Sequence, residues 1–257
     1  MTDLVVDAQR VGKVFGDGED RVEALSEITL RIEAGEFISL IGPSGCGKST
    51  LLRLVGDLTS PTSGELTING KPPARARTDR DYGIVFQKAT LLDWRTVTKN
   101  VELPLEIMGV DDRDQVASRM LELVQLADFA DHYPWQLSGG MQQRVAIARA
   151  LTFNPSLLLM DEPFGALDEM TRELMQQEVL RIWAETGTTV VFVTHSIPEA
   201  VFLSTRVAVM SPRPGRISEV IDIGLAQPRD VDTRESRQYY DKVTQVREAL
   251  RRQEAQE

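Results

Sequence analysis

The chain has 257 residues, of which 42% are hydrophobic and 26% charged, and these proportions are ordinary for a soluble globular protein with a sizeable core. Its 29 basic and 39 acidic residues leave a formal net charge of −10, which opposes binding to nucleic acid and direct adsorption to anionic lipid. The single cysteine excludes an internal disulfide, no apolar run reaches the roughly 18 residues that span a bilayer, and Met1 to Leu4 lack a signal-peptide pattern, so we expect a cytoplasmic protein.

Strand patterns dominate the beginning and the end of the chain. A strand over Leu4–Val11 is expected to pair with the alternating apolar positions Ile28, Leu30 and Ile32. Continuous apolar runs then occur at Phe37–Ile41, Gly83–Phe86, Leu157–Met160, Val190–Thr194 and Val207–Met210. Such runs, separated by helical segments, indicate a mainly parallel sheet covered on both faces.

Helical patterns replace the strands between Ala89 and Asn154. We therefore predict an α/β fold in which residues 1–88 and 155–225 form a core with an N-terminal antiparallel β subdomain. Residues 89–154 are predicted to form an inserted α-helical subdomain. Residues 226–257 read as a short C-terminal helical tail, amphipathic and frayed at its end.

A glycine-rich loop, GPSGCGKST, follows the run Phe37–Ile41 and precedes a helix. It fits the phosphate-binding pattern G-x-x-x-x-G-K-[ST], in which backbone N–H groups and a helix N-terminus surround an anion. Lys48 would reach the β- and γ-phosphates, and Ser49 would hold Mg²⁺. A chance glycine turn is the alternative, and the strand–loop–helix context argues against it. The predicted nucleotide contacts are Gly42, Pro43, Ser44, Gly45, Cys46, Gly47, Lys48, Ser49 and Thr50.

The thiol of Cys46 lies inside this loop. Because a helix N-terminus stabilises a thiolate, we expect a lowered pKa and reaction with maleimide from which ATP protects. The alternative is a small residue that fills a loop position without a role.

Two acidic residues end the apolar run in LLLMDEP, residues 157–163. Asp161 is suited to the Mg²⁺ shell, and Glu162 to polarising the water that attacks the γ-phosphate. Taken alone, the pair reads equally well as the N-cap of a helix. The phosphate loop upstream favours the catalytic interpretation.

Three further residues occupy positions that suit a nucleotide site. His195 follows the run Val190–Thr194, at the strand end where ligands of parallel sheets bind, and it would contact the γ-phosphate. Gln87 follows another strand, and its amide would reach Mg²⁺ or the attacking water. Phe15 precedes a turn and would stack on adenine. The alternatives are a structural histidine, a surface glutamine and a core phenylalanine.

The loop after Gln87 carries Leu91, Leu92 and Trp94. Exposed apolar residues in a loop are typical of a docking surface. The alternative is a loop that packs on its own helical subdomain.

A second glycine loop, LSGGMQQR at residues 137–144, also runs into a helix. Together with GPSGCGKST, Gln87, LLLMDE, GALD at residues 165–168 and the histidine of VTHS, it resembles the ATP-binding subunits of ABC transporters. The resemblance covers about the first 220 residues with the motifs in the right order. In that family two subunits pack head to tail, and each ATP lies between the phosphate loop of one and the signature loop of the other.

The resemblance implies roles for particular residues. Ser138, Gly139 and Gly140 would touch the γ-phosphate bound by Lys48 of the partner subunit, with Gln142 beside them, and Asp168 would lie across the dimer interface. ATP and Mg²⁺ are the expected cofactors. The implied catalytic residues are Glu162, His195, Gln87 and Lys48, and the implied metal ligands are Ser49, Gln87 and Asp161.

A finer resemblance, through LLDWRTVTKNVELPLEIMG and MSPRPGRI, is to importer ATPases of the nitrate, sulfonate and taurine type. Importers of thiamine-precursor pyrimidines carry similar segments. The resemblance implies a homodimer or a pair with a related ATPase, bound to membrane permease subunits at the cytoplasmic face of the membrane and served by an extracytoplasmic solute-binding protein. The alternatives are a soluble ABC ATPase acting on DNA or ribosomes, and a small-molecule P-loop kinase, which would leave LSGGMQQR without a role.

Overall fold

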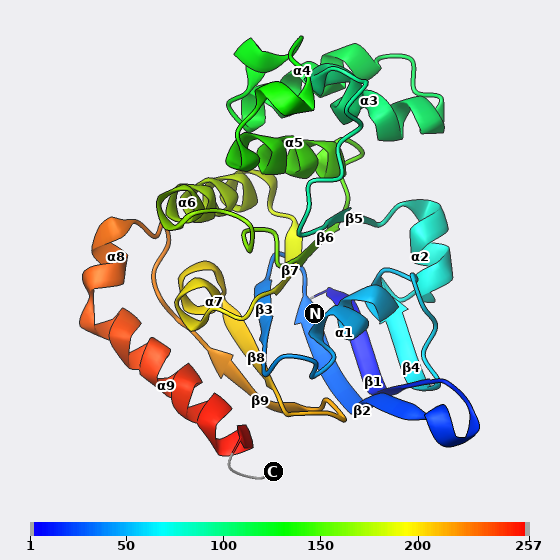
Figure 1. The fold of residues 1–257 in the computed structure, drawn as a ribbon, viewed down its shortest axis with the longest axis vertical. Helices are drawn as coiled ribbons and strands as arrows, with labels where there is room; N and C mark the ends of the chain where they lie inside the picture. The colour runs from blue at the N-terminus through cyan, green and yellow to red at the C-terminus, as the bar shows by residue number, and fades with distance from the viewer. Residues whose placement is uncertain (1–2, 255–257) are drawn as a thin grey trace.

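The computed structural model describes residues 3–254, so the two N-terminal residues and the end of the predicted tail, residues 255–257, lie outside it. Two sheets form the framework (Figure 1). The smaller one has the order β2-β1-β4, with β1 Leu4–Phe15, β2 Val22–Glu33 and β4 Ser63–Ile68. Its strands are antiparallel, and Ala8 pairs with Leu30 and Val11 with Ile28, so the predicted pairing is confirmed.

The larger sheet has the order β5-β6-β7-β3-β8-β9, and its strands are parallel except for β9. The bounds are β3 Phe37–Ile41, β5 Tyr82–Val85, β6 Leu157–Asp161, β7 Thr189–Val193, β8 Arg206–Met210 and β9 Ile217–Asp222. The four central strands are almost wholly buried, which explains their continuous apolar runs.

Successive residues of the central strands divide the hydrophobic core into two clusters. In β3, Ile38 and Leu40 join one cluster, whereas Phe37 and Ile41 join the other. The first contains α1 Lys48–Val55 and the small sheet, and the second contains the helices of the opposite face. The period of two along each strand therefore places one layer on each face of the sheet.

The remaining helices are α2 Pro73–Asp79, α3 Val97–Met108, α4 Arg113–Leu123, α5 Gly139–Leu151, α6 Glu169–Thr186, α7 Ile197–Leu203, α8 Val231–Glu235 and α9 Arg237–Glu254. Figure 1 shows α3, α4 and α5 together at one end of the molecule, and α8 and α9 along the side of the large sheet. The apolar stripe of α9 is buried through Tyr239, Val243, Val246 and Ala249. The expected fold class, a parallel-rich core with an antiparallel sheet and inserted helices, is confirmed.

Two strand ends differ from the sequence-based expectation. The run Gly83–Phe86 forms a strand only as far as Val85, and the Phe86 carbonyl instead accepts a hydrogen bond from Gln143. Likewise β7 ends at Val193, and the hydroxyl of Thr194 bonds the side chain of Glu199. At Phe86 a side chain of α5 therefore takes the place of a sheet partner, and at Thr194 a side chain of α7 holds the hydroxyl just beyond the strand.

Candidate functional site

The candidate site lies where the parallel strands β3, β5, β6 and β7 end. Because these strands run in the same direction, the segments after their carboxyl ends meet at one edge of the sheet. These segments carry the phosphate loop, Gln87, Asp161–Glu162 and His195. Backbone bonds tie the ends together, from the Glu162 N–H to the Val193 carbonyl at 3.0 Å and from the Thr194 N–H to the Leu40 carbonyl at 3.3 Å.

The phosphate loop joins β3 to α1 and closes around the side chain of Lys48. The ammonium group of Lys48 donates to the carbonyl oxygens of Gly42 at 2.8 Å and Pro43 at 2.9 Å, and the residue is buried. The helix begins at Lys48, so its free N–H groups face the loop. A cation and a helix N-terminus therefore converge on one concave backbone segment, which is an arrangement for binding an anion.

Two oxygen ligands lie beside this loop. The hydroxyl of Ser49, in the first turn of α1, donates to Oδ1 of Asp161 at 2.8 Å. Asp161 is the last residue of β6 and is partly exposed, so its carboxylate remains accessible. A hydroxyl and a carboxylate in contact match the oxygen ligands that Mg²⁺ prefers, and Asp161 supplies the negative charge.

Glu162 and His195 come from adjacent strands and meet at the sheet edge. Nδ1 of His195 lies 3.2 Å from Oε2 of Glu162. The backbone of Glu162 has φ 46°, a left-handed conformation that is uncommon for a residue other than glycine. The imidazole is more than half exposed, so it can contact both Glu162 and a group bound on the solvent side.

The turn between β8 and β9, residues 211–216, supports the phosphate loop from behind. The Gly215 N–H donates to the Ala24 carbonyl, and its own carbonyl accepts from the Ser26 N–H, both at 3.0 Å. A Cβ on Gly215 would lie 1.9 Å from the carbonyl oxygen of Cys46. The turn therefore touches the back of the loop so closely that only glycine fits.

The expectation of an activated thiol at Cys46 is wrong. The side chain is 1% exposed and points into the core between the small sheet and α1, so a reagent cannot reach it directly. Burial raises the pKa of the Cys46 thiol, and the nearby charge of Lys48 only partly offsets this rise. Desolvation of the thiolate outweighs the helix N-terminus.

The segment after β5 is attached to α5 rather than to the sheet. Gln143 of α5 donates to the Phe86 carbonyl at 3.0 Å, and Arg149 of α5 donates to the carbonyls of Ala89 and Thr90, both at 2.9 Å. Gln87 lies between these anchors and is exposed. α5 therefore sets the position of the Gln87 loop.

The D-loop glycine adjoins the Gln87 amide. A Cβ on Gly165 would meet Nε2 of Gln87 at 2.9 Å, so a side chain at position 165 would displace that amide. Asp168 is the N-cap of α6, where its carboxylate accepts from the Thr171 N–H at 3.0 Å. These hydrogen bonds lower the pKa of Asp168. Phe15, at the end of β1, is 43% exposed and available for stacking.

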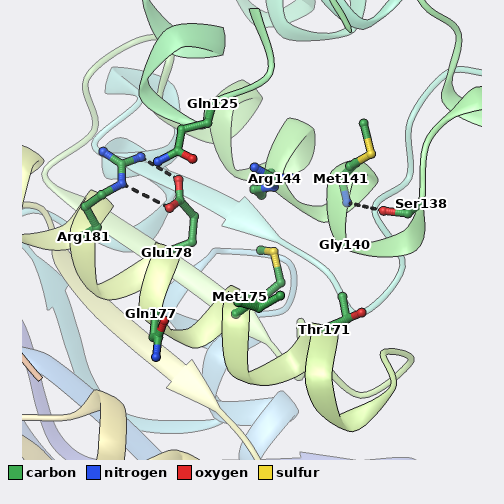
Figure 2. A pocket seen from close by; sticks show the side chains of 11 residues that line it. Gln125, Ser138, Gly140, Met141, Arg144, Thr171, Met175, Gln177, Glu178 and Arg181 are labelled. Carbon is green, nitrogen blue, oxygen red and sulfur yellow. Dashed lines mark hydrogen bonds and ion pairs between the residues drawn. The ribbon is translucent and has the colours of Figure 1, made fainter. Parts of the chain in front are cut away.

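The signature loop forms the N-terminus of α5. Ser138 is the N-cap, and its hydroxyl accepts from the Met141 N–H at 3.3 Å. Figure 2 shows Ser138 and Gly140 beside Thr171 and Met175 of α6, at one end of a groove of about 580 Å³ between the two helices. A Cβ on Gly140 would lie 2.7 Å from Cγ2 of Thr171, so this glycine lets α5 approach α6.

Gln142 turns back onto its own loop. Its amide donates to the carbonyls of Pro134 at 2.9 Å and Leu137 at 3.3 Å. It therefore holds the segment that leads to Ser138. In this conformation the amide is engaged by its own chain.

The structure brings most of the predicted residues together but leaves the two glycine loops in separate parts of the chain. Lys48, Ser49, Asp161, Glu162 and His195 meet at the edge of the large sheet. The signature loop lies at the start of α5, in the helical end of the molecule, away from α1 (Figure 1). Gln143 and Gly215 could not be predicted from the sequence, because their partners at Phe86 and Cys46 are far away in the chain.

Comparison with known proteins identifies the family. Residues 25–165 match the family model described as ABC transporter. An uncharacterized ABC transporter ATP-binding protein of Methanocaldococcus jannaschii is 48% identical over 93% of this chain and 89% of its own length. The taurine import ATP-binding protein TauB of Roseobacter denitrificans is 45% identical over 86% and 82% of the two chains.

Two further similarities concern substrate and assembly. The aliphatic sulfonates import ATP-binding protein SsuB of Bacillus thuringiensis is 42% identical over 94% of this chain and 95% of its own length. A solved dimeric ATP-binding cassette in a post-hydrolysis state, bound to ADP and phosphate, superposes with a TM-score of 0.73 at 38% identity, over 86% of this chain and all of that one. The chain belongs to the ABC transporter family of ATP-binding subunits, which hydrolyse ATP.

Proposed function

We propose that the chain is the ATP-hydrolysing subunit of an importer of the nitrate, sulfonate and taurine type, working as a head-to-tail dimer beneath a separate permease. The observation that carries the proposal is the separation of two phosphate-binding elements: the loop around Lys48 at the sheet edge and the helix N-terminus at Ser138. A second copy related by a twofold axis would place each Ser138 over the other copy's phosphate loop. The dimeric relative bound to ADP and phosphate supports this assembly.

The contacts at the sheet edge suggest the role of each residue. The phosphate loop binds the triphosphate, and Lys48 would give up its hydrogen bonds to the two loop carbonyls in order to bind the phosphates. Phe15 stacks on the base. Glu162 accepts the proton of the attacking water. His195, which already contacts Glu162, keeps that carboxylate in place and reaches the γ-phosphate from its exposed side.

Ser49 and Asp161 would hold Mg²⁺, with Gln87 as a further oxygen ligand. The contact between the Ser49 hydroxyl and the Asp161 carboxylate gathers two suitable ligands. The ion would neutralise phosphate charge when the nucleotide is bound. Gln87 approaches from the loop that α5 controls, so its position depends on the helical subdomain.

The permease would bind the loop that contains Trp94. Trp94 is 75% exposed, yet the loop backbone beneath it is fixed by Asn100. The buried amide of Asn100 accepts from the Leu92 N–H at 2.7 Å and donates to the carbonyls of Leu92 and Arg95, both at 3.1 Å. A rigid loop that presents an exposed indole is suited to docking another protein. The described residues include no helix with the length and hydropathy of a membrane span.

ATP-dependent dimerisation tests the assembly. Glu162→Gln retains the binding groups but loses the base, so size-exclusion chromatography with ATP and Mg²⁺ should show a dimer. Glu162→Gln combined with Ser138→Arg is the matched control, which should bind ATP and remain a monomer. A Glu162→Gln chain that stays monomeric in saturating ATP would refute the head-to-tail site.

Uptake by the complete transporter tests the substrate class. The chain and its permease would be reconstituted in vesicles with the solute-binding protein, and uptake of taurine, an alkanesulfonate, nitrate and a pyrimidine would be compared. We expect a small sulfonate to be imported, because two relatives carry import names for taurine and aliphatic sulfonates. Uptake of the pyrimidine alone would assign the alternative importer class.

A further inference from the structure

A buried chain of polar side chains connects the C-terminal segment with the loop that carries His195. Arg234 of α8 donates to the Oε1 atom of Gln176 in α6, and Nε2 of Gln176 donates to Oε1 of Glu199 in α7 at 3.0 Å. The other oxygen of Glu199 accepts the hydroxyl of Thr194, directly before His195. Gln176, Thr194 and Glu199 are each at most 5% exposed.

The direction of every hydrogen bond in this chain is set by chemistry. Arginine can only donate, so the carbonyl oxygen of the Gln176 amide faces Arg234 and its NH₂ group faces Glu199. The Thr194 hydroxyl accepts from the Ser196 N–H at 3.0 Å, which leaves its proton for Glu199. Two donors therefore converge on the carboxylate, one on each oxygen.

Burial of the Glu199 carboxylate costs free energy, because its charged form loses contact with water. Burial raises its pKa, whereas the hydrogen bonds from Thr194 and Gln176 favour the charged form. The same carboxylate fixes Thr194, whose hydroxyl in turn fixes Ser196 on the far side of His195. The imidazole itself is largely exposed, so its placement against Glu162 depends on this backbone support.

We propose that Glu199 is a positioning residue that holds His195 against Glu162, and that Arg234 and Gln176 anchor it from the C-terminal segment. Arg234 is itself fixed, because its guanidinium lies 3.7 Å from the centre of the Phe202 ring in α7. The side-chain hydrogen bonds of Glu199 go to Gln176 and Thr194 and not to a predicted nucleotide contact. It acts on the hydrolytic step through His195, and so the inference rests on the role proposed for His195.

Glu199→Gln tests the proposal in the full-length chain. Glutamine has one acceptor oxygen, so if that oxygen faces Gln176, its NH₂ group faces the Thr194 hydroxyl and the proton of Thr194 loses its acceptor. The support of the Thr194 loop is therefore weakened. Because small displacements of reacting groups are expensive, we expect kcat for ATP hydrolysis to fall about tenfold while KM for ATP stays within about twofold. Glu102→Gln is the matched control, since Glu102 is equally buried but lies in α3, away from the sheet edge, and should retain wild-type kcat.

A reciprocal exchange separates positioning from stability. In the double variant Gln176→Glu, Glu199→Gln, the new carboxylate accepts from Arg234 and from the new amide, whose oxygen accepts from Thr194. All three hydrogen bonds return, and only the one between positions 176 and 199 has its donor and acceptor exchanged, so kcat should recover to within about twofold of wild type. In a His195→Ala background, Glu199→Gln should produce no further loss of kcat.

Each measurement can overturn the proposal. Wild-type kcat in Glu199→Gln overturns it, as does a double variant that melts like wild type but hydrolyses like Glu199→Gln. A loss of kcat that persists in the His195→Ala background would also overturn it, because Glu199 would then act by another route. Wild-type kcat in His195→Ala alone would refute the role of His195 proposed above, and this inference with it.

Discussion

Gly215→Ala tests the support that the β8–β9 turn gives to the phosphate loop. The new methyl group would lie 1.9 Å from the carbonyl oxygen of Cys46 and 3.2 Å from a methyl group of Leu25. Ordinary contact begins near 3.4 Å, so the turn and the loop must separate by about 1.5 Å. Because hydrogen bonds to both Ala24 and Ser26 hold the turn in place, we expect the phosphate loop to be the element that moves.

Two effects of Gly215→Ala follow from this displacement. Overpacking of a tight contact costs typically 1–3 kcal/mol, and at about 2–4 °C per kcal/mol for a chain of this size the melting temperature should fall by several degrees. A loop displaced by more than 1 Å misplaces the bound phosphates, so kcat/KM for ATP should fall about a hundredfold.

Calorimetry with and without ATP, together with steady-state hydrolysis, measures both effects of Gly215→Ala. Gly70→Ala is the control, because that glycine lies in a turn with open space around it and only its positive φ is strained. It should lose about 1 kcal/mol and retain ATP affinity. Wild-type melting temperature and ATP affinity in Gly215→Ala would refute the reasoning.

Three further predictions concern other parts of the chain. Maleimide should label Cys46 in the folded chain at least about tenfold more slowly than in urea, and faster as pH rises, because only the thiolate reacts; equal rates would contradict its burial. Ser138→Ala removes the cap of the Met141 N–H, so calorimetry should show a loss of about 1 kcal/mol, and ultracentrifugation a weaker ATP-dependent dimer. Trp94→Ala should spare basal ATPase activity but reduce co-purification of the permease, whereas Tyr240→Ala on α9, similarly exposed, should not; unchanged co-purification would argue against docking.

The structure also explains why some contacts of the candidate site follow from sequence patterns and others do not. Ser49 and Asp161 are far apart in the chain, yet Ser49 begins the helix after one buried strand and Asp161 ends another, so the rule for parallel sheets predicts that they lie near each other. For Cys46 the local argument, that a helix N-terminus lowers the pKa of a thiol, gives the wrong answer. The side chain points into a core that the small sheet completes. The helix N-terminus can be recognised from the local sequence, whereas the burial that dominates the pKa of the Cys46 thiol depends on distant parts of the chain.

The sequence by itself determined the layered architecture and the order of the motifs. A short apolar run is enough to indicate a buried parallel strand, and closely spaced glycines before a helix are enough to indicate an anion-binding loop. It also placed the Lys48 loop and the Ser138 loop far apart along the chain. Tertiary structure decided what each local feature contacts: Gly140 faces Thr171, Gly215 faces Cys46, and Gln176 of α6 donates to Glu199 of α7. Those contacts join residues distant in sequence, and their distances depend on how helices and sheets pack, which no local pattern specifies.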